Sequence, residues 1–133
     1  MLVIHTDGGA RNNPGPAGIG AVIARDGIVL SEISEYIGAQ TNNFAEYTAV
    51  IRALEMCIEK GWLEALSFKL DSKLVVEQVQ GNWKVKEVTL KPLVTKVQTL
   101  AIQFPSVSYE YVPREENREA DRLVNEAIDN ATL

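Results

Sequence analysis

At 133 residues, 46% of them hydrophobic, the chain suits one domain spanning residues 1–133, with enough apolar side chains for a buried core. Its formal net charge of −5 argues against tight, sequence-blind binding to phosphate backbones through a large basic patch. The lack of a signal peptide, and of any run near the ~20 apolar residues of a membrane span, predicts a cytoplasmic protein with no membrane partner.

The first predicted element is a strand within residues 2–10, in which strand-forming residues run up to Asp7. Gly8 and Gly9 follow and are expected to allow a sharp exit and a close approach by a ligand. An acid at the end of a buried strand lies where α/β sheets usually bind ligands, although Asp-Gly alone would indicate a turn. Three more acids recur downstream at strand ends or helix starts, which favours a functional interpretation: Glu46, Asp71 and Asp121.

A loop and a hairpin are expected next. Residues 11–18 are so rich in Gly, Pro and Asn that they predict a loop. The β-prone runs 19–25 and 28–37 flank Asp26-Gly27, the strongest short-range signal for a two-residue hairpin. The opening of the chain therefore predicts three consecutive antiparallel strands.

The first helix is predicted from apolar residues at three- and four-residue spacing between Tyr47 and Ile58. Cap-type residues 40–43 precede it and a glycine at 61 ends it. Glu46 is expected in its first turn, near the positive end of the helix dipole, where an acid can also be purely stabilising. Cys57, the single cysteine, falls on the apolar stripe, so we expect a small core residue and not a nucleophile.

Residues 66–70 predict a short strand that again stops on an acid, Asp71, followed by a helical pattern over residues 74–80. Taken alone, Asp71 would be the N-cap of that helix. Trp83 then lies next to Lys84 after a Gly-Asn turn. This pattern suits a core ring about as well as a ring that stacks on a sugar or base beside phosphate-binding cations.

The C-terminal part predicts a helix around residues 93–100, a last strand over residues 107–112 and a final helix. An amphipathic stripe over residues 120–128 defines that helix, with Asn117 as its expected cap. Asp121 lies near the helix start beside the stripe, so it can face the edge of the sheet.

The element order predicts a mixed five-stranded sheet, its first three strands antiparallel, with helices on both faces. If the first and fourth strands are parallel neighbours, Asp7 and Asp71 lie close together, and Glu46 and Asp121 can converge on them. Four ionised carboxylates share a small site only when cations compensate them, because like charges raise one another's pKa. All-oxygen ligands suit a hard divalent ion such as Mg²⁺. Two such ions would suit phosphodiester hydrolysis.

Four motifs stand in order along the chain: Thr6-Asp7-Gly8-Gly9 with Asn13-Pro14-Gly15-Pro16-Ala17-Gly18, Thr41-Asn42-Asn43-Phe44-Ala45-Glu46, Leu70-Asp71-Ser72, and Asn117-Arg118-Glu119-Ala120-Asp121. In this order and at these separations, the chain resembles a type 1 ribonuclease H of the short prokaryotic subgroup over essentially its whole length. The resemblance implies the ribonuclease H-like fold and cleavage of the RNA strand of RNA/DNA hybrids, giving 5′-phosphate and 3′-hydroxyl ends. Some short relatives also cut double-stranded RNA. No obligate protein partner is evident.

The resemblance also implies two Mg²⁺ ions, for which Mn²⁺ can substitute, and a role for each acid. Asp7 would bridge both ions, and Glu46 and Asp71 would hold the ion on the leaving-group side. Asp121 would hold the ion that carries the attacking water. The expected substrate-binding residues comprise matches to minor-groove positions, where 2′-hydroxyls distinguish RNA from DNA, and three others: Gly8, Gly9, Asn13, Thr41 and Asn43, with Ser72, Trp83 and Lys84.

The loop before the last acid departs from many family members because it has no histidine. Arg114 is the nearest match and resembles the arginine of the short subgroup. We expect it to assist catalysis electrostatically, because a pKa above ~12 prevents it from shuttling protons. The alternative is an exposed arginine paired with Glu115 or Glu116. His5, the only histidine, is expected to be a packed or hydrogen-bonded strand residue and not a ligand.

A non-catalytic module of the same fold, binding nucleic acid or protein, is the second hypothesis. Modules of that kind usually lack one or more of the acids, whereas all four are present here. Fold alone does not determine the substrate, so duplex RNA stays a separate possibility.

Overall fold

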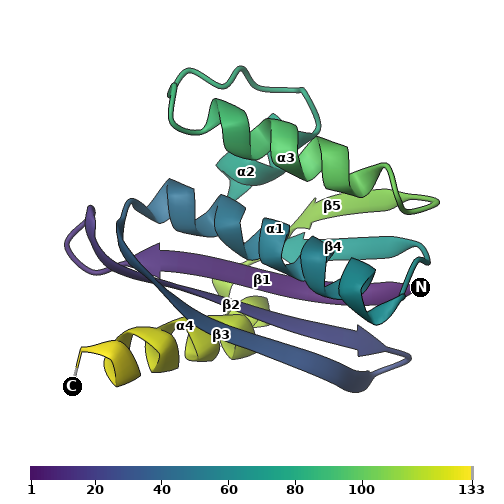
Figure 1. The fold of residues 1–133 in the computed structure, drawn as a ribbon, viewed down its shortest axis with the longest axis horizontal. Helices are drawn as coiled ribbons and strands as arrows, with labels where there is room; N and C mark the ends of the chain where they lie inside the picture. The colour runs from purple at the N-terminus through teal and green to yellow at the C-terminus, as the bar shows by residue number, and fades with distance from the viewer. Residues whose placement is uncertain (133) are drawn as a thin grey trace.

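The chain forms five strands: β1 (Leu2–Ala10), β2 (Gly15–Arg25), β3 (Ile28–Gln40), β4 (Leu66–Leu70) and β5 (Val107–Tyr111). In this computed structural model, which describes residues 1–132, they make one sheet in the order β3-β2-β1-β4-β5 (Figure 1). β1 and β3 are antiparallel to β2, whereas β4 is parallel to both β1 and β5. The predicted mixed sheet, with its first three strands antiparallel, is confirmed.

The β2–β3 hairpin turns at the predicted dipeptide. Asp26 and Gly27 have positive φ angles of 52° and 78°, and Arg25 pairs with Ile28 across the turn. Positive φ at both positions matches the twist of the flanking strands. β3 runs on to Gln40, beyond its predicted end.

Part of the predicted loop was wrong, because β2 already begins at Gly15. The glycines of this strand have a packing role that composition alone does not reveal. A Cβ on Gly20 would lie 2.3 Å from the carbonyl oxygen of Ala120, and one on Gly18 would lie 2.9 Å from that of Val124. Real Cβ atoms do not approach so closely, so these glycines let a helix lie directly on the sheet.

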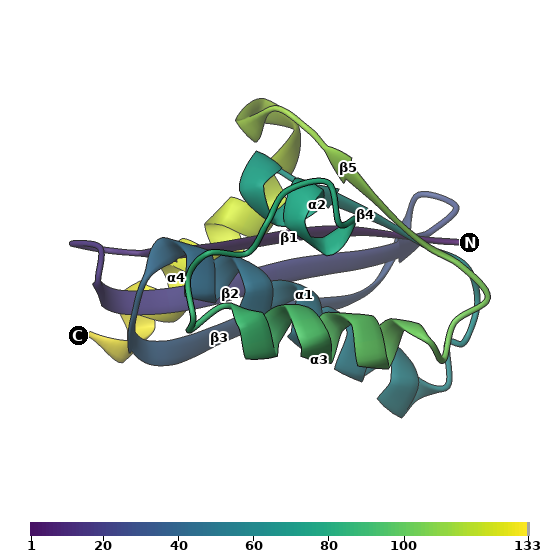
Figure 2. The ribbon, with the colours of Figure 1, turned by 90° about the horizontal axis from the view of Figure 1, so that it is seen from above.

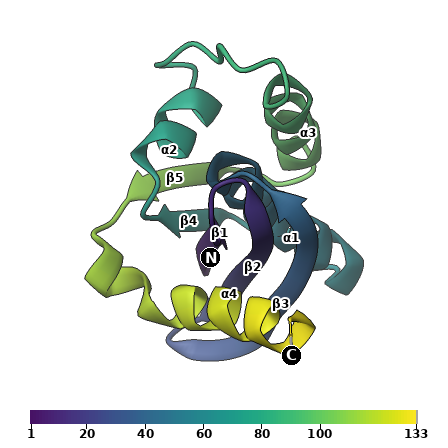
Figure 3. The ribbon, with the colours of Figure 1, turned by 90° about the vertical axis from the view of Figure 1, so that its left-hand side faces the viewer.

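Helices cover both faces of the sheet, as predicted. α1 (Asn42–Lys60) crosses one face, and α3 (Lys91–Ala101) lies beside it (Figures 1 and 2). α4 (Arg118–Ala131) lies on the opposite face, over β2 and β3 (Figure 3). The short helix α2 (Lys73–Val79) follows β4, and the 3₁₀ turn η1 (Arg114–Asn117) leads into α4.

Side-chain caps fix where α1 and α2 begin. The hydroxyl of Thr41 accepts a hydrogen bond from the Phe44 N–H at 3.2 Å, and that of Ser72 accepts one from the Val75 N–H at 3.3 Å. Ser72, and not Asp71, is therefore the N-cap of α2. The carboxylate of Asp71 is left available for other contacts.

The core lies between α1 and the sheet, where apolar side chains of both are fully buried, among them Ile4, Leu54 and Phe68. Cys57 is part of this core, as predicted, and burial raises the pKa of its thiol to about 11. Within residues 1–132, no helix is long and apolar enough to cross a membrane.

Candidate functional site

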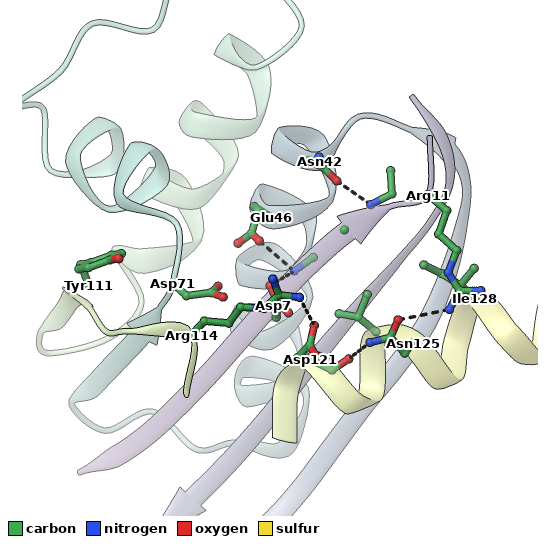
Figure 4. Close-up of a pocket in the computed structure, with 14 residues that line it drawn as sticks. Asp7, Arg11, Asn42, Glu46, Asp71, Tyr111, Arg114, Asp121, Asn125 and Ile128 are labelled. Carbon is green, nitrogen blue, oxygen red and sulfur yellow. Dashed lines mark hydrogen bonds and ion pairs between the residues drawn. The ribbon is translucent and has the colours of Figure 1, made fainter. Parts of the chain in front are cut away.

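Three carboxylates meet where β1 and β4 stop pairing. The parallel register ends with Thr6 opposite Leu70, so the following residues, Asp7 and Asp71, lie side by side. Glu46 reaches them from α1 (Figure 4). One oxygen of each carboxylate lies within 4.8 Å of the other two. The strand ends thus bring together acids that are far apart in the sequence.

Glu46 reaches this point because Gly8 has no side chain. A Cβ on Gly8 would lie 2.3 Å from the backbone of Ala45, so α1 could not approach. The Gly8 N–H donates hydrogen bonds to Asp7 Oδ1 at 2.9 Å and to Glu46 Oε1 at 3.3 Å. One backbone group therefore orients two of the acids.

Two local expectations are corrected here. β1 does not exit at Gly8 and Gly9 but stays paired with β2 through Ala10. Glu46 lies in the second turn of α1, since the helix begins at Asn42 and has no acid in its first turn. Its position follows from the close approach of α1 to β1 at Gly8. The helix dipole acts on acids of the first turn and does not account for it.

Burial and crowding raise the pKa values of two acids in the cluster. Burial, together with the charges of Asp71 and Asp121, raises the pKa of Asp7 to about 7. The pKa of Glu46 is also raised, first by burial and then by the charge of Asp7. Among the described residues, Glu46 Oε2 is a buried oxygen without a hydrogen-bond partner. A divalent cation would relieve both the crowding and the unpaired oxygen, so this all-oxygen donor set fits such an ion.

Asp121 lies in the first turn of α4, near the helix start as predicted. It lines the same cleft as the three clustered acids, which has a volume of about 450 Å³. Its charge is close enough to raise the pKa of Asp7. Asp121 lies outside the tight group of three, so the cleft offers acids on two sides of Asp7 (Figure 4).

Arg114 lines this cleft next to the acids. Its side chain is 80% exposed, and its Nη2 lies 3.9 Å from Asp121 Oδ1. Within residues 1–132, Asp121 is the ion-pair partner of Arg114, and neither Glu115 nor Glu116 pairs with it. The guanidinium therefore stands over the acid cleft and not against its own loop.

Asn117 is a residue whose contribution the sequence did not reveal. It was expected to cap α4, but its side chain makes no capping hydrogen bond. Instead, its buried Nδ2 donates to the Thr6 carbonyl oxygen at 2.8 Å and to Asp71 Oδ1 at 3.4 Å. Its place within the last motif was the signal that could have identified it.

Of the expected substrate-binding residues, Gly8 and Gly9 line the acid cleft, and so does Asn42, which was not singled out. Asn13 Oδ1 accepts a hydrogen bond from the Asn42 N–H at 2.9 Å, so the β1–β2 loop is tied to the start of α1. Asn42 Oδ1 in turn accepts one from the Ala10 N–H at 2.8 Å. These contacts hold two chain segments together along one side of the cleft.

The remaining expected residues lie elsewhere. The hydroxyls of Thr41 and Ser72 serve as helix caps, and Asn43 Nδ2 is 3.5 Å from a Glu87 oxygen. Trp83 is 45% exposed, so it is not a core ring. With Lys84 it lines a second cavity of about 580 Å³, which shares no lining residue with the acid cleft.

His5 is half-buried on β1 and lines a small cavity with Glu116 and Asn117. Burial lowers its pKa, and the charge of Lys69 adds to this effect. Among the described residues, the potential metal-binding group does not include it. The expectation of a packed strand histidine agrees with this position.

Similarity to known proteins covers nearly the whole chain. A family model described as reverse transcriptase-like matches residues 5–127. Bifunctional protein Rv2228c of Mycobacterium tuberculosis is 50% identical over 132 residues, covering 98% of this chain and 36% of that protein. Ribonuclease HI of Halobacterium salinarum is 40% identical over 128 residues, covering 96% of this chain and 64% of that protein. The chain thus spans about a third of the first relative and less than two thirds of the second.

A solved structure is similar over its full length. LC11-RNase H1, in complex with an RNA/DNA hybrid, superimposes with a TM-score of 0.94 and 48% sequence identity. The superposition covers 100% of both chains. The two chains therefore share the fold described above.

Proposed function

This chain belongs to the ribonuclease H family and has that family's fold, and from this premise we propose that it hydrolyses the RNA strand of RNA/DNA hybrids. It would act as one domain over residues 1–133 and as an endonuclease, leaving 5′-phosphate and 3′-hydroxyl ends. The observation that carries the proposal is the cleft that gathers four carboxylates, three of them with oxygens within 4.8 Å of one another. The hybrid bound to LC11-RNase H1 supports the choice of substrate.

Two divalent cations are the proposed cofactors, Mg²⁺ with Mn²⁺ as a substitute. Asp7 would be shared by both ions, with Glu46 and Asp71 on one side and Asp121 on the other. The unpaired Glu46 Oε2 and the pKa of Asp7, which is raised by burial and by the charges of Asp71 and Asp121, support this set, because a nearby cation would stabilise both groups. When bound, the ions would supply the Lewis-acid chemistry that phosphodiester hydrolysis needs.

The chain's own groups would hold these acids ready before substrate arrives. The Gly8 N–H orients Asp7 and Glu46, and the amide of Asn117 orients Asp71. Fixed geometry of this kind lowers the cost of reorganisation during the reaction. Arg114 would add a positive charge at the open side of the cleft, where it would hold the scissile or product phosphate.

Recognition of the hybrid would use two surfaces. The half-buried backbone at Gly9, which lines the cleft with Asn42, suits a minor groove in which the 2′-hydroxyl distinguishes RNA from DNA. The second cavity, with Trp83 and Lys84, would stack on a sugar or base and neutralise a phosphate. Its separation from the acids fits a contact to a part of the hybrid away from the cleavage point.

End-labelled RNA/DNA hybrid, duplex RNA and duplex DNA, each incubated with the protein and Mg²⁺, test this proposal. We expect cutting of the hybrid, no cutting of duplex DNA and no activity with EDTA. Isolated deoxynucleotides in the RNA strand should block cutting at those positions. Binding without cleavage would instead favour the non-catalytic module, and equal cutting of duplex RNA would broaden the substrate class.

A further inference from the structure

The acid cleft has two cationic side chains among its described lining residues, Arg114 and Arg11. Arg114 lies over the acids, whereas Arg11 lies away from them toward one end of the cleft, near Asn125 (Figure 4). Arg114 belongs to the proposed reaction already described. Arg11 has no role in it so far, although it is held in place more firmly than Arg114.

Both the backbone and the side chain of Arg11 are fixed. Its N–H donates a hydrogen bond to the Pro16 carbonyl oxygen at 2.9 Å, which closes the β1–β2 loop. A Cβ on Gly15 would lie 1.8 Å from the Arg11 carbonyl oxygen, so the loop closes this tightly only with glycine there. Arg11 Nη1 lies 2.6 Å from Asp129 Oδ1, and Nη2 donates to Asn125 Oδ1 at 3.2 Å.

These contacts leave part of the Arg11 guanidinium free for a ligand. A guanidinium has five N–H donors, and the two side-chain contacts use only some of them. The side chain is 44% exposed and that of Asp129 is 61% exposed, so their ion pair contributes little to stability. The pair orients the cation more than it holds the fold together.

The charge of the loaded cleft explains why such a cation is needed. Two divalent ions would balance the four carboxylates and leave no net attraction for the phosphates on either side of the scissile one. A polyanionic strand that crosses the cleft therefore needs further phosphate-binding donors beyond the reacting centre, such as the free N–H groups of Arg11. Arginine suits phosphate because its planar donors match the phosphate oxygens.

We propose that Arg11 binds a backbone phosphate of the RNA strand, on the side of the scissile phosphate away from Arg114. Asp129 and Asn125 are positioning residues that aim the guanidinium before the strand arrives. Asn125 also donates to the Asp121 carbonyl oxygen at 3.0 Å, so the side chain that orients Arg11 lies one turn along α4 from an acid of the cleft. This inference rests on the proposed function and adds a determinant of strand position to it.

Hybrids with one neutral methylphosphonate linkage, moved stepwise along the RNA strand, test this contact. Binding of the full chain is measured by fluorescence anisotropy in EDTA, and cleavage is measured in Mg²⁺. Arg11→Ala should weaken binding about tenfold, as expected when a charged hydrogen bond is lost. Its binding should also depend less on salt, with a log–log slope shallower by about 0.7–0.9. At one position along the RNA strand, the neutral linkage should weaken binding of the wild-type protein by a similar factor. The same linkage should leave the binding of Arg11→Ala unchanged.

Two further variants separate a phosphate contact from a structural tether. Arg122→Ala removes an arginine of α4 that is paired with Glu119 and Glu126 and lies outside the cleft, so it should bind like wild type. Asp129→Asn keeps the Arg11 charge, so it should lose less binding than Arg11→Ala and still respond to the neutral linkage. Equal losses in Asp129→Asn and Arg11→Ala, or the same response to every linkage with and without Arg11, overturn the proposal.

The two readouts also keep this inference apart from the proposed function. Linkage-dependent binding without cleavage would sustain the Arg11 contact and reject the endonuclease. Cleavage of the hybrid without any linkage dependence would reject the Arg11 contact alone.

Discussion

The side-chain amide of Asn117, at the start of α4, donates a hydrogen bond to the Asp71 carboxylate at 3.4 Å. The same buried amide donates to the Thr6 carbonyl oxygen at 2.8 Å. One side chain therefore connects the last helix to the ends of two strands and sets the direction of an acid.

Asn117→Ala should destabilise the fold and weaken metal binding together. The Thr6 carbonyl would lose a buried donor, which costs about 1–3 kcal/mol, and Asp71 would lose its orienting group. Thermal unfolding should show a lower melting temperature, and cleavage should need more Mg²⁺ for half-maximal rate. Gln80→Ala is the matched control, since the exposed Gln80 amide donates to the Tyr109 carbonyl oxygen at 3.0 Å and neither residue lines the acid cleft. Equal Mg²⁺ dependence in both variants would contradict a role in orienting Asp71.

Asp7→Asn should abolish cleavage without unfolding the protein. The carboxylate lies between Glu46 and Asp71 on one side and Asp121 on the other, where a neutral amide cannot replace a shared ligand. Gel analysis of labelled hybrid, with circular dichroism as the check on folding, measures this. Substantial Mg²⁺-dependent activity in this variant would refute the assignment of the site.

The same substitution should make the metal-free protein more stable, by an amount that depends on pH. The pKa of Asp7 is raised from 3.8 to about 7, so the folded state holds this proton more tightly than the unfolded chain does. The resulting stabilisation is fully present below about pH 4 and is lost as the pH rises toward 7. In EDTA, the melting temperature of Asp7→Asn should exceed that of wild type by a margin that widens between these values. A constant margin would mean that Asp7 does not titrate in this range.

Gly8→Ala should unfold or severely destabilise the protein, whereas Gly9→Ala should fold normally. The added Cβ would lie 2.3 Å from the Ala45 backbone in the first case but 3.8 Å from its nearest neighbour, Val124, in the second. Overpacking against backbone costs at least the ~1–3 kcal/mol seen for core side chains. Differential scanning calorimetry of the two variants compares them directly. Similar melting temperatures would show that α1 can move away from β1.

Arg114→Ala should lower turnover by about 10²–10³-fold, the loss typical of one charge-stabilising donor, with little change in melting temperature. The exposed side chain and the 3.9 Å separation from Asp121 explain why stability should not change. Arg114→Lys should recover part of the rate. Steady-state kinetics would settle the matter, and wild-type turnover in the alanine variant would leave only a surface ion pair.

Local signals were sufficient for the order of elements and for the acids. Asp26-Gly27 predicted the hairpin because a two-residue turn is encoded by the residues that form it. Asp7 and Asp71 were expected to meet because each follows a strand run, and their strands are indeed parallel neighbours.

Features that depend on distant contacts could not be predicted in this way. Arg11 meets residues 114 and 118 positions away on α4, and Asn117 meets Thr6 across 111 positions. Neither pairing leaves a periodic pattern. The sequence predicts a loop for part of residues 15–20. A strand whose glycines make room for a helix has the same composition as a loop.

The bare position at Gly8 also bears on attempts to rebuild this chemistry elsewhere. The acids come from the sheet and from the helices on both of its faces, since Glu46 belongs to α1 on one face and Asp121 to α4 on the other. If only the four carboxylates were grafted onto another sheet, a side chain at the position of Gly8 would keep the helix, and with it Glu46, away from the other acids. The graft must include an opening in the strand, so the smallest transferable unit is the acids together with the glycine that lets one of them through.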